Sequence, residues 1–209
     1  LAGLEHADSG EIIIDGRVVN DVPASERGIG FVFQNYALFR YMTVYDNIAF
    51  GLDVKKWKKA DIRRRVDELV ELVGLKGFEK RYPNQLSGGQ RQRARIAMTL
   101  AQETEMILLD EPTTYLDMAY QLDVLQLLER MNREKQLTIV MVLHDLNEAC
   151  RFADHIIGLK NGKVVCEGRP AEVITRENIR EIYGIDAKLV MSDGGYPICM
   201  EFDRVIKTL

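Results

Sequence analysis

Two adjacent carboxylates, Asp110 and Glu111, follow a short apolar run at residues 106–109. The run predicts a buried strand, and the carboxyl ends of strands are where α/β folds bind ligands. Because successive side chains of a strand point to opposite faces, the two acids can take different tasks. In nucleotide hydrolysis one acid holds Mg²⁺, usually through water, and another orients or deprotonates the attacking water. The plainer interpretation is two charged residues at a strand end, which is a common arrangement.

A serine followed by two glycines marks the start of a helix predicted at residues 87–102. Backbone N–H groups are exposed at such a start and the helix dipole adds positive potential, so the segment can cradle a phosphate. An ordinary capped loop would show the same serine and glycines. The polar continuation QRQR makes the pattern more specific than a glycine pair alone. The segment consists of Leu86, Ser87, Gly88, Gly89 and Gln90.

Three more polar residues stand at the ends of predicted elements. His144 follows the apolar run 137–143 and can hydrogen-bond a terminal phosphate, although a strand-end histidine with an ordinary partner is the simpler interpretation. Gln34 ends a strand predicted at residues 28–34, where it can give an oxygen to Mg²⁺ or bond a water, or be a simple polar terminus. Asp117 is placed to cap the helix that follows it.

Strand and helix signals alternate through the middle of the chain, which predicts an α/β core. The continuously apolar run 137–143 is typical of a strand inside a parallel sheet that is covered on both faces. Residues 43–102 contain no predicted strand, so we expect them to form a helical insertion. Apolar spacing and capping residues predict helices at residues 43–52, 61–75, 87–102, 120–135, 145–153 and 175–184.

Antiparallel hairpins are expected near both ends of the chain. Asp15-Gly16 and Asn161-Gly162 each interrupt a strand-like pattern with the residues that a two-residue turn requires. Two further strands are predicted around residues 193–195.

Composition is that of an ordinary globular protein. The 209 residues suffice for one large domain or two small ones. The chain has 28 Lys plus Arg against 32 Asp plus Glu, and its net charge of −4 lacks the basic excess of a nucleic-acid-binding protein. The three cysteines have no CxxC spacing, so we expect reduced thiols in a cytoplasmic protein and no zinc site. No apolar run approaches the roughly 18–20 residues that cross a bilayer.

Taken in their order along the chain, the polar motifs closely resemble those of the ATP-binding subunit of ATP-binding cassette (ABC) transporters. LSGGQ resembles the family's signature motif and MILLDE its Walker B strand. FQ, ending at Gln34, resembles the Q-loop, Leu116-Asp117 the D-loop and His144 the switch histidine. The resemblance covers essentially the whole chain. It implies an α/β, P-loop NTPase-like core with antiparallel β hairpins, a single domain over residues 1–209, and a helical signature subdomain at approximately residues 43–102.

The resemblance also implies a role for each matching residue, with ATP and Mg²⁺ as cofactors. Two such subunits would sandwich two ATP molecules, each signature segment contacting the γ-phosphate held by the opposite subunit. Asp110 would hold Mg²⁺ together with Gln34, Glu111 would be the general base, and His144 would sense the γ-phosphate. The expected nucleotide contacts of the signature segment and D-loop are Leu86, Ser87, Gly88, Gly89, Gln90 and Asp117.

Partners and location follow from the same resemblance. The second ATP-binding subunit is expected to be an identical copy, and the pair would drive a transmembrane permease that receives its solute from a substrate-binding protein. The loop running from Gln34 through Tyr41 would dock the permease. The protein would therefore lie at the cytoplasmic face of the inner membrane, held there by the permease.

One family motif does not occur in the sequence. No GxxxxGK[ST], the loop whose backbone amides and lysine hold the β- and γ-phosphates, is present. In the family this loop lies just upstream of a segment like residues 1–4. The resemblance therefore implies an N-terminally truncated cassette, and the 209 residues alone are expected to have negligible ATPase activity. Substantial turnover that Glu111→Gln abolishes would contradict this expectation.

The transported solute is indicated less clearly. Residues 1–51 resemble sulfate-type import ATPases, whereas residues 92–209 resemble iron–siderophore import ATPases, as in a recombinant or a natural intermediate. Since more of the chain has the second resemblance, iron-chelate import is the leading prediction and import of sulfate or a related anion is the alternative. A catalytically silent cassette, or a cassette ATPase acting in translation or DNA repair, are further alternatives.

Overall fold

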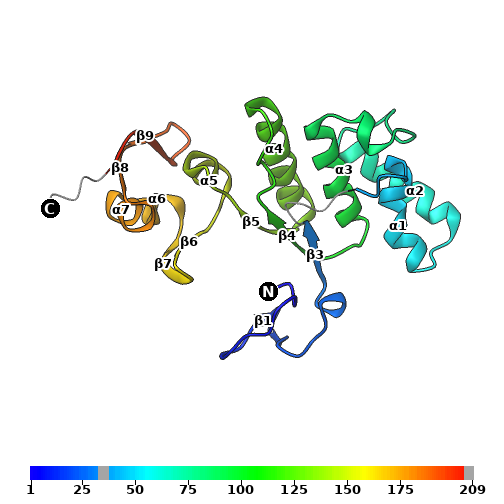
Figure 1. Cartoon of the computed structure of the whole chain (residues 1–209), viewed down its shortest axis with the longest axis horizontal. Helices are drawn as coiled ribbons and strands as arrows, with labels where there is room; N and C mark the ends of the chain where they lie inside the picture. The colour runs from blue at the N-terminus through cyan, green and yellow to red at the C-terminus, as the bar shows by residue number, and fades with distance from the viewer. Residues whose placement is uncertain (33–37, 205–209) are drawn as a thin grey trace. The chain divides into compact units, whose positions relative to one another are not determined.

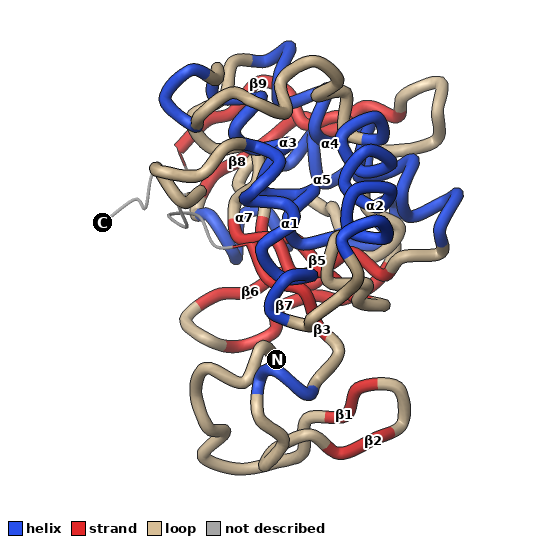
Figure 2. The backbone as a smooth tube through the Cα atoms, turned by 90° about the vertical axis from the view of Figure 1, so that its right-hand side faces the viewer, coloured by secondary structure: helices blue, strands red, loops and turns tan. Residues whose placement is uncertain are grey.

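The computed structural model describes residues 1–32 and 38–204, and the chain divides into two compact units, Leu1–Val142 and Leu143–Leu209. The first unit contains a parallel sheet, a long helix and the predicted helical segment, and the second contains two hairpins with three short helices (Figures 1 and 2). That the whole chain forms one domain with a subdomain at residues 43–102 stays a prediction.

A three-stranded parallel sheet forms the centre of the first unit. Its strands are β3 (Ile29–Val32), β4 (Met106–Asp110) and β5 (Thr138–Val142), in the order β3-β4-β5. The register pairs Val32 with Leu109 and Asp110 with Val142, so the carboxyl ends of β4 and β5 meet at one edge. The α/β core predicted from the alternating elements is confirmed. This edge is where the acids of β4 lie.

Strand β5 differs from its prediction. Within the part of the chain that the structure describes, it is an outermost strand of the sheet, not an interior one. Ile139 and Met141 pack against the main core, whereas Val140 is 41% exposed and Val142 is 50% exposed. The prediction of a strand covered on both faces is therefore wrong for this sheet. β-Branched residues favour a strand on either face, so an apolar run does not report whether both faces are covered.

In the described residues 38–105, between β3 and β4, the regular elements are all helical, as predicted for residues 43–102. They are α1 (Val44–Val54), α2 (Lys59–Leu72), the 3₁₀ turn η2 (Pro83–Gln85) and α3 (Gly88–Leu100). Thr43 begins α1 with a capping box, since its hydroxyl accepts from the Asp46 amide at 3.2 Å. In α2 the buried positions Ile62, Val66, Leu69 and Val70 recur at helical spacing and supply much of the core.

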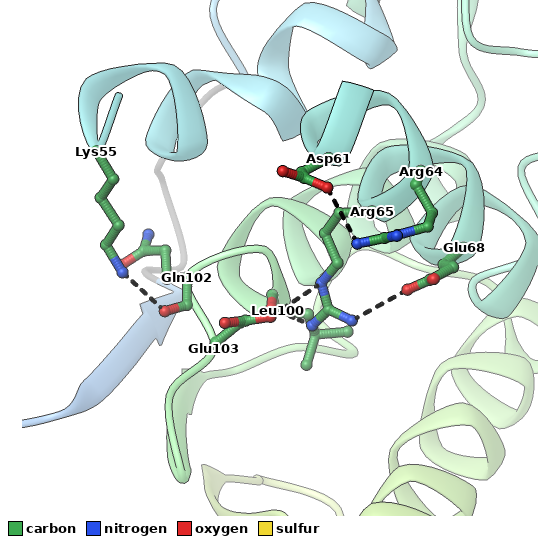
Figure 3. A network of polar contacts seen from close by, with 8 residues as sticks. All are labelled: Lys55, Asp61, Arg64, Arg65, Glu68, Leu100, Gln102 and Glu103. Carbon is green, nitrogen blue, oxygen red and sulfur yellow. Dashed lines mark hydrogen bonds and ion pairs between the residues drawn. The ribbon is translucent and has the colours of Figure 1, made fainter. Parts of the chain in front are cut away.

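Cationic side chains from α2 and from the residue that follows α1 meet the carboxyl end of α3 (Figure 3). Lys55 Nζ donates to the Gln102 carbonyl at 3.0 Å, and Arg65 Nη2 donates to the Leu100 carbonyl at 3.2 Å. The Arg65 guanidinium also lies 3.7 Å from the Glu103 carboxylate. Carbonyls at a helix end have no intrahelical partner and carry partial negative charge, so both cations stabilise this end. The contacts tie the three helices together.

A hairpin, a 3₁₀ turn and a long helix complete the first unit. Strands β1 (Ile13–Ile14) and β2 (Arg17–Val18) form the hairpin predicted at Asp15-Gly16, whose φ angles of 48° and 72° are those of a two-residue turn. The turn η1 (Ala24–Glu26) leads into β3. Helix α4 (Met118–Lys135) follows β4 and packs its buried residues, among them Val124 and Leu128, into the main core.

The second unit begins with α5 (Leu146–Phe152), capped by Asp145. Both predicted hairpins are confirmed, the first with Asn161-Gly162 at its tip. The remaining elements are β6 (Ile156–Lys160), β7 (Lys163–Gly168), α6 (Pro170–Val173), α7 (Arg176–Tyr183), β8 (Ile185–Met191) and β9 (Pro197–Arg204). Its small core includes the free thiols of Cys150 and Cys199. Among the described residues, none of the helices has the length and apolarity to cross a membrane.

Candidate functional site

The signature segment is held in one conformation by its own side chains. Ser87 is the N-cap of α3, and its hydroxyl accepts from the Gln90 amide at 3.2 Å. The Gln90 side chain completes a capping box by accepting from the Ser87 amide at 2.9 Å. Leu86 is buried, and Arg91 Nη1 donates to its carbonyl at 2.6 Å. The helix start predicted at Ser87 is confirmed.

The two glycines of this segment allow close packing against the start of α4. A Cβ at Gly89 would lie 2.9 Å from Tyr120 Cδ1 and 3.0 Å from Tyr120 Cγ, closer than real Cβ contacts come. A Cβ at Gly88 would lie 3.3 Å from Leu116 Cδ2. The signature segment therefore rests directly on the residues that follow the acids of β4. Its backbone N–H groups are also the first of α3, and such groups have no intrahelical partner.

Asp110 and Glu111 occupy the edge of the sheet that the sequence predicts. Asp110 is the last residue of β4, whereas Glu111 has a φ of 50° and turns the chain away from the strand. Left-handed backbone is uncommon for a residue with a side chain, and it tends to occur where the surrounding structure fixes it. Here the Thr114 hydroxyl donates to Glu111 Oε2 at 2.9 Å and the Thr114 amide to the Glu111 carbonyl at 3.3 Å. These contacts fix the carboxylate.

Asp117 performs the capping function that the sequence predicts. Its carboxylate accepts from the Tyr120 amide at 3.1 Å and so begins α4. The Gln121 side chain donates to the Thr113 carbonyl at 3.3 Å, which holds the preceding turn against the helix. Asp117 is itself exposed. A nucleotide contact from Asp117 is compatible with this capping role and stays a prediction.

The two other predicted residues belong to other parts of the chain. Gln34 lies outside the described residues. His144 lies in the second unit, two residues beyond the end of β5, and its side chain is exposed. Its role at a γ-phosphate stays a prediction, as does that of Gln34.

The carboxylate at the end of β4 fits the predicted Mg²⁺. Among the described residues, no three His, Cys, Asp or Glu side chains gather as a ready-made metal site. Mg²⁺ at nucleotide sites is held by one or two carboxylates together with phosphate and water, so a single carboxylate at a strand end fits it. Asp110 supplies that carboxylate.

A second feature is a cavity of about 800 Å³ beside the signature segment, and its lining includes Tyr41 of the predicted docking loop and Arg91 of the QRQR continuation. We call it the arginine groove. Arg91 and Arg95 stand one turn apart on α3, a spacing visible in the sequence that could have drawn attention to this face. The residues that line the groove are Leu38, Arg40, Tyr41, Tyr82, Pro83, Asn84, Gln85, Arg91 and Arg95.

Comparison with known proteins finds one matching family, described as ABC transporter, over residues 1–114. Among curated proteins, the sulfate/thiosulfate import ATP-binding protein CysA of Mycobacterium bovis is 49% identical over 173 residues. That alignment covers 83% of this chain and 49% of the relative, so the chain spans about half the length of the curated relatives it matches.

Two solved structures have the same fold. The first is the dimeric ATP-binding cassette MJ0796 in a post-hydrolysis state bound to ADP and Pi. It matches with a TM-score of 0.70 and 37% identity, over 80% of this chain and 76% of that one. The second is a putative metal-chelate type ABC transporter in an inward-facing conformation. It matches with a TM-score of 0.73 and 28% identity, over 86% of this chain and 73% of that one.

Proposed function

We propose a function from one premise, which is that this chain belongs to the ABC transporter family. The protein would be the ATP-binding subunit of an importer, and ATP hydrolysis at its dimer interface would drive solute uptake. The observation that carries this proposal is that the signature segment packs against the residues that follow the acids of β4. Gly88 packs beside Leu116 and Gly89 beside Tyr120, five and nine positions after Glu111, so the signature segment lies against the part of the chain that follows the acids.

The signature segment would act by binding phosphate. The first backbone N–H groups of α3 are free of intrahelical partners and carry the positive end of the helix dipole. The Ser87 hydroxyl accepts from the Gln90 amide, and its own proton is available to donate to a phosphate oxygen. The capping box keeps these donors aimed in one direction. They would bind the γ-phosphate of ATP that a second subunit holds.

The acids of β4 would act on the same nucleotide chemistry in their own subunit. Asp110 would hold Mg²⁺, which supplies charge neutralisation for the phosphates when it is bound. Glu111 would accept a proton from the attacking water. The Thr114 hydroxyl holds Oε2 of this carboxylate at 2.9 Å and so orients it. His144 and Gln34 would complete the site.

The solute is better matched by the sulfate alternative than by the iron-chelate prediction. The sulfate/thiosulfate import protein of M. bovis is 49% identical over 173 residues, which reach well into the part of the sequence that resembles iron–siderophore ATPases. The metal-chelate type transporter structure is 28% identical. We therefore propose that the importer carries sulfate or a related oxyanion, with iron-chelate uptake as the second candidate.

The proposed partners are those of such an importer. They are a second ATP-binding subunit, a membrane permease and, through the permease, a substrate-binding protein. A dimeric state of MJ0796 supports the first of these. The protein would lie at the cytoplasmic face of the membrane through its permease.

The test is purification of the full-length protein with its membrane partners, followed by measurement of ATP turnover. We expect it to co-purify with a permease and to hydrolyse ATP. Glu111→Gln should lower turnover about 10²–10⁴-fold, the usual contribution of a general base. Glu134→Gln, at an exposed position of α4, is the matched control and should leave turnover unchanged. Co-sedimentation with ribosomes in place of a permease would contradict the proposal.

A further inference from the structure

The turn between α1 and α2 carries a concentrated positive charge. Residues 55–64 contain six Lys or Arg residues and one acidic residue, in a chain whose net charge is −4. All six cationic residues are exposed. We call them the basic patch, which consists of Lys55, Lys56, Lys58, Lys59, Arg63 and Arg64.

The chain itself neutralises little of this charge. Arg64 pairs with Asp61 at 3.1 Å, and Lys55 donates to the Gln102 carbonyl, which is a neutral acceptor (Figure 3). The other four cations are free of ion pairs with any residue in the described ranges 1–32 and 38–204. They are Lys56, Lys58, Lys59 and Arg63.

Lysines of the basic patch occupy positions where the backbone favours other residues. Lys56 directly follows the C-cap of α1 with a φ of 57°, whereas Gly74 takes the same place after α2 with a φ of 68°. Lys58 is the N-cap of α2 and makes no side-chain cap bond, although the N-caps of α1, α3 and α4 each accept a backbone amide. Lys59 begins α2, where the helix dipole disfavours a cation. A charge that weakens local structure in this way is expected where it serves a function.

The surroundings of the basic patch favour a lipid surface over a nucleic acid. Val54 precedes the patch and is 66% exposed, and Trp57 within it is partly buried against the main core. Apolar and aromatic side chains beside Lys and Arg are typical of segments that lie at a membrane interface. A nucleic-acid-binding domain has a basic excess overall, whereas the 32 acidic residues of this chain would repel a long polyanion.

We propose that the basic patch binds the anionic phospholipid headgroups of a membrane surface, with Val54 in contact with the headgroup layer. The choice of a membrane rests on the proposed function, which places the protein at the cytoplasmic face. It adds a direct lipid contact to the attachment through the permease. Each Lys or Arg held near an anionic surface strengthens binding about fivefold.

The test is sedimentation of the chain with vesicles of phosphatidylcholine alone, or of phosphatidylcholine with about 30% of the anionic phosphatidylglycerol. We expect binding to the anionic vesicles only, and weaker binding as the salt concentration rises from about 0.05 M to about 0.5 M. Replacing both Lys58 and Lys59 by glutamine should weaken binding about 25-fold, or about fivefold for each charge. Because Lys58 makes no cap bond, this variant should retain the circular dichroism of the unchanged chain.

The matched control is Lys135→Gln with Lys163→Gln. It removes the same charge from two exposed positions outside the basic patch, and it should bind the anionic vesicles as the unchanged chain does. An equal loss of binding in both double variants would indicate a general charge effect and would overturn the proposal.

Other results would also overturn it. One is equal binding to the two kinds of vesicle, or binding to neither. Another is release from the anionic vesicles by millimolar inorganic phosphate at constant ionic strength, which would assign the basic patch to a free anion. A third is patch-dependent binding to a duplex oligonucleotide that is tighter than binding to the vesicles, which would assign it to a nucleic acid.

The outcome is separable from that of the proposed function, because the vesicles contain no permease. If the full-length protein co-purifies with a permease and hydrolyses ATP but the chain does not bind anionic vesicles, this inference alone fails. If the chain binds the vesicles through the basic patch and no permease co-purifies, the proposed function fails and the lipid contact stands.

Discussion

Replacing Gly88 and Gly89 separately by alanine should have opposite effects on stability. Both glycines stand in the first turn of α3, where alanine favours the helix by up to about 1 kcal/mol. At Gly88 the new Cβ would meet only Leu116 Cδ2, at 3.3 Å, which is the far end of a flexible side chain. Because that side chain can yield by a few tenths of an ångström, Gly88→Ala should be neutral or stabilising.

At Gly89 the same methyl group has no such room. It would lie 2.9 Å from Cδ1, 3.0 Å from Cγ and 3.2 Å from Cβ of Tyr120, the end of the side chain nearest to the backbone of α4. Tyr120 is itself held in place, since its amide donates to the Asp117 cap. Overpacking of this kind costs about 1–3 kcal/mol. The helix-propensity gain is common to both variants, so the overpacking alone should separate them.

The assay is urea or thermal unfolding followed by far-ultraviolet circular dichroism. Gly89→Ala should unfold about 3 °C lower than Gly88→Ala for each kcal/mol of overpacking. Tyr120→Ala removes the two closest atoms, so in that background the two variants should unfold alike. Equal stability of Gly88→Ala and Gly89→Ala with Tyr120 intact would refute the reasoning that the second glycine is required for this close packing.

Three further predictions follow from single contacts. Ser87→Ala should lower the free energy of unfolding by about 1 kcal/mol, because the Gln90 amide loses its acceptor, whereas Ser87→Thr should largely retain it in the same urea titration. Thr114→Val should lower ATP turnover of the full-length protein about tenfold while Thr114→Ser preserves it, since only a hydroxyl orients Glu111; equal turnover would show that the contact is dispensable. Burial, with the neighbouring Cys199, raises the pKa of the Cys150 thiol to about 12. Native Cys150 should therefore resist a thiol reagent at pH 8, as read by peptide mass mapping, and react in urea. The buried, protonated Cys150 thiol should contribute fully to the free energy of unfolding below about pH 9. This contribution should be lost as the pH rises towards 12, because the unfolded chain then releases the proton first.

Local signals explain why most elements are predictable from the sequence. Ser87, Asp117 and Thr175 each begin a helix by accepting a hydrogen bond from the amide three residues later, which depends only on neighbouring residues. Asp15-Gly16 and Asn161-Gly162 likewise encode their turns locally. The acids at the end of β4 are predictable for the same reason, because a strand's end fixes which edge of the sheet they reach.

Long-range features are not encoded in this way. Gly89 and Tyr120 are 31 positions apart, and nothing in either neighbourhood indicates that one packs on the other. Tyr41 and Arg95 meet at one groove only because α1, α2 and α3 fold together between them. The exposure of Val140 depends on which elements cover β5. The sequence of this subunit also need not encode which solute is carried, since in the proposed importer the solute contacts the permease and binding protein.

The most direct measurement of the central claim is solute uptake into liposomes that contain the full-length protein and its permease. With ATP present on the side of the ATP-binding subunit, we predict accumulation of labelled sulfate or thiosulfate, lost in Glu111→Gln and preserved in Glu134→Gln. ATP-driven accumulation of an iron chelate with no sulfate uptake would contradict the proposed solute. Uptake that persists unchanged in Glu111→Gln would contradict the account of the site itself.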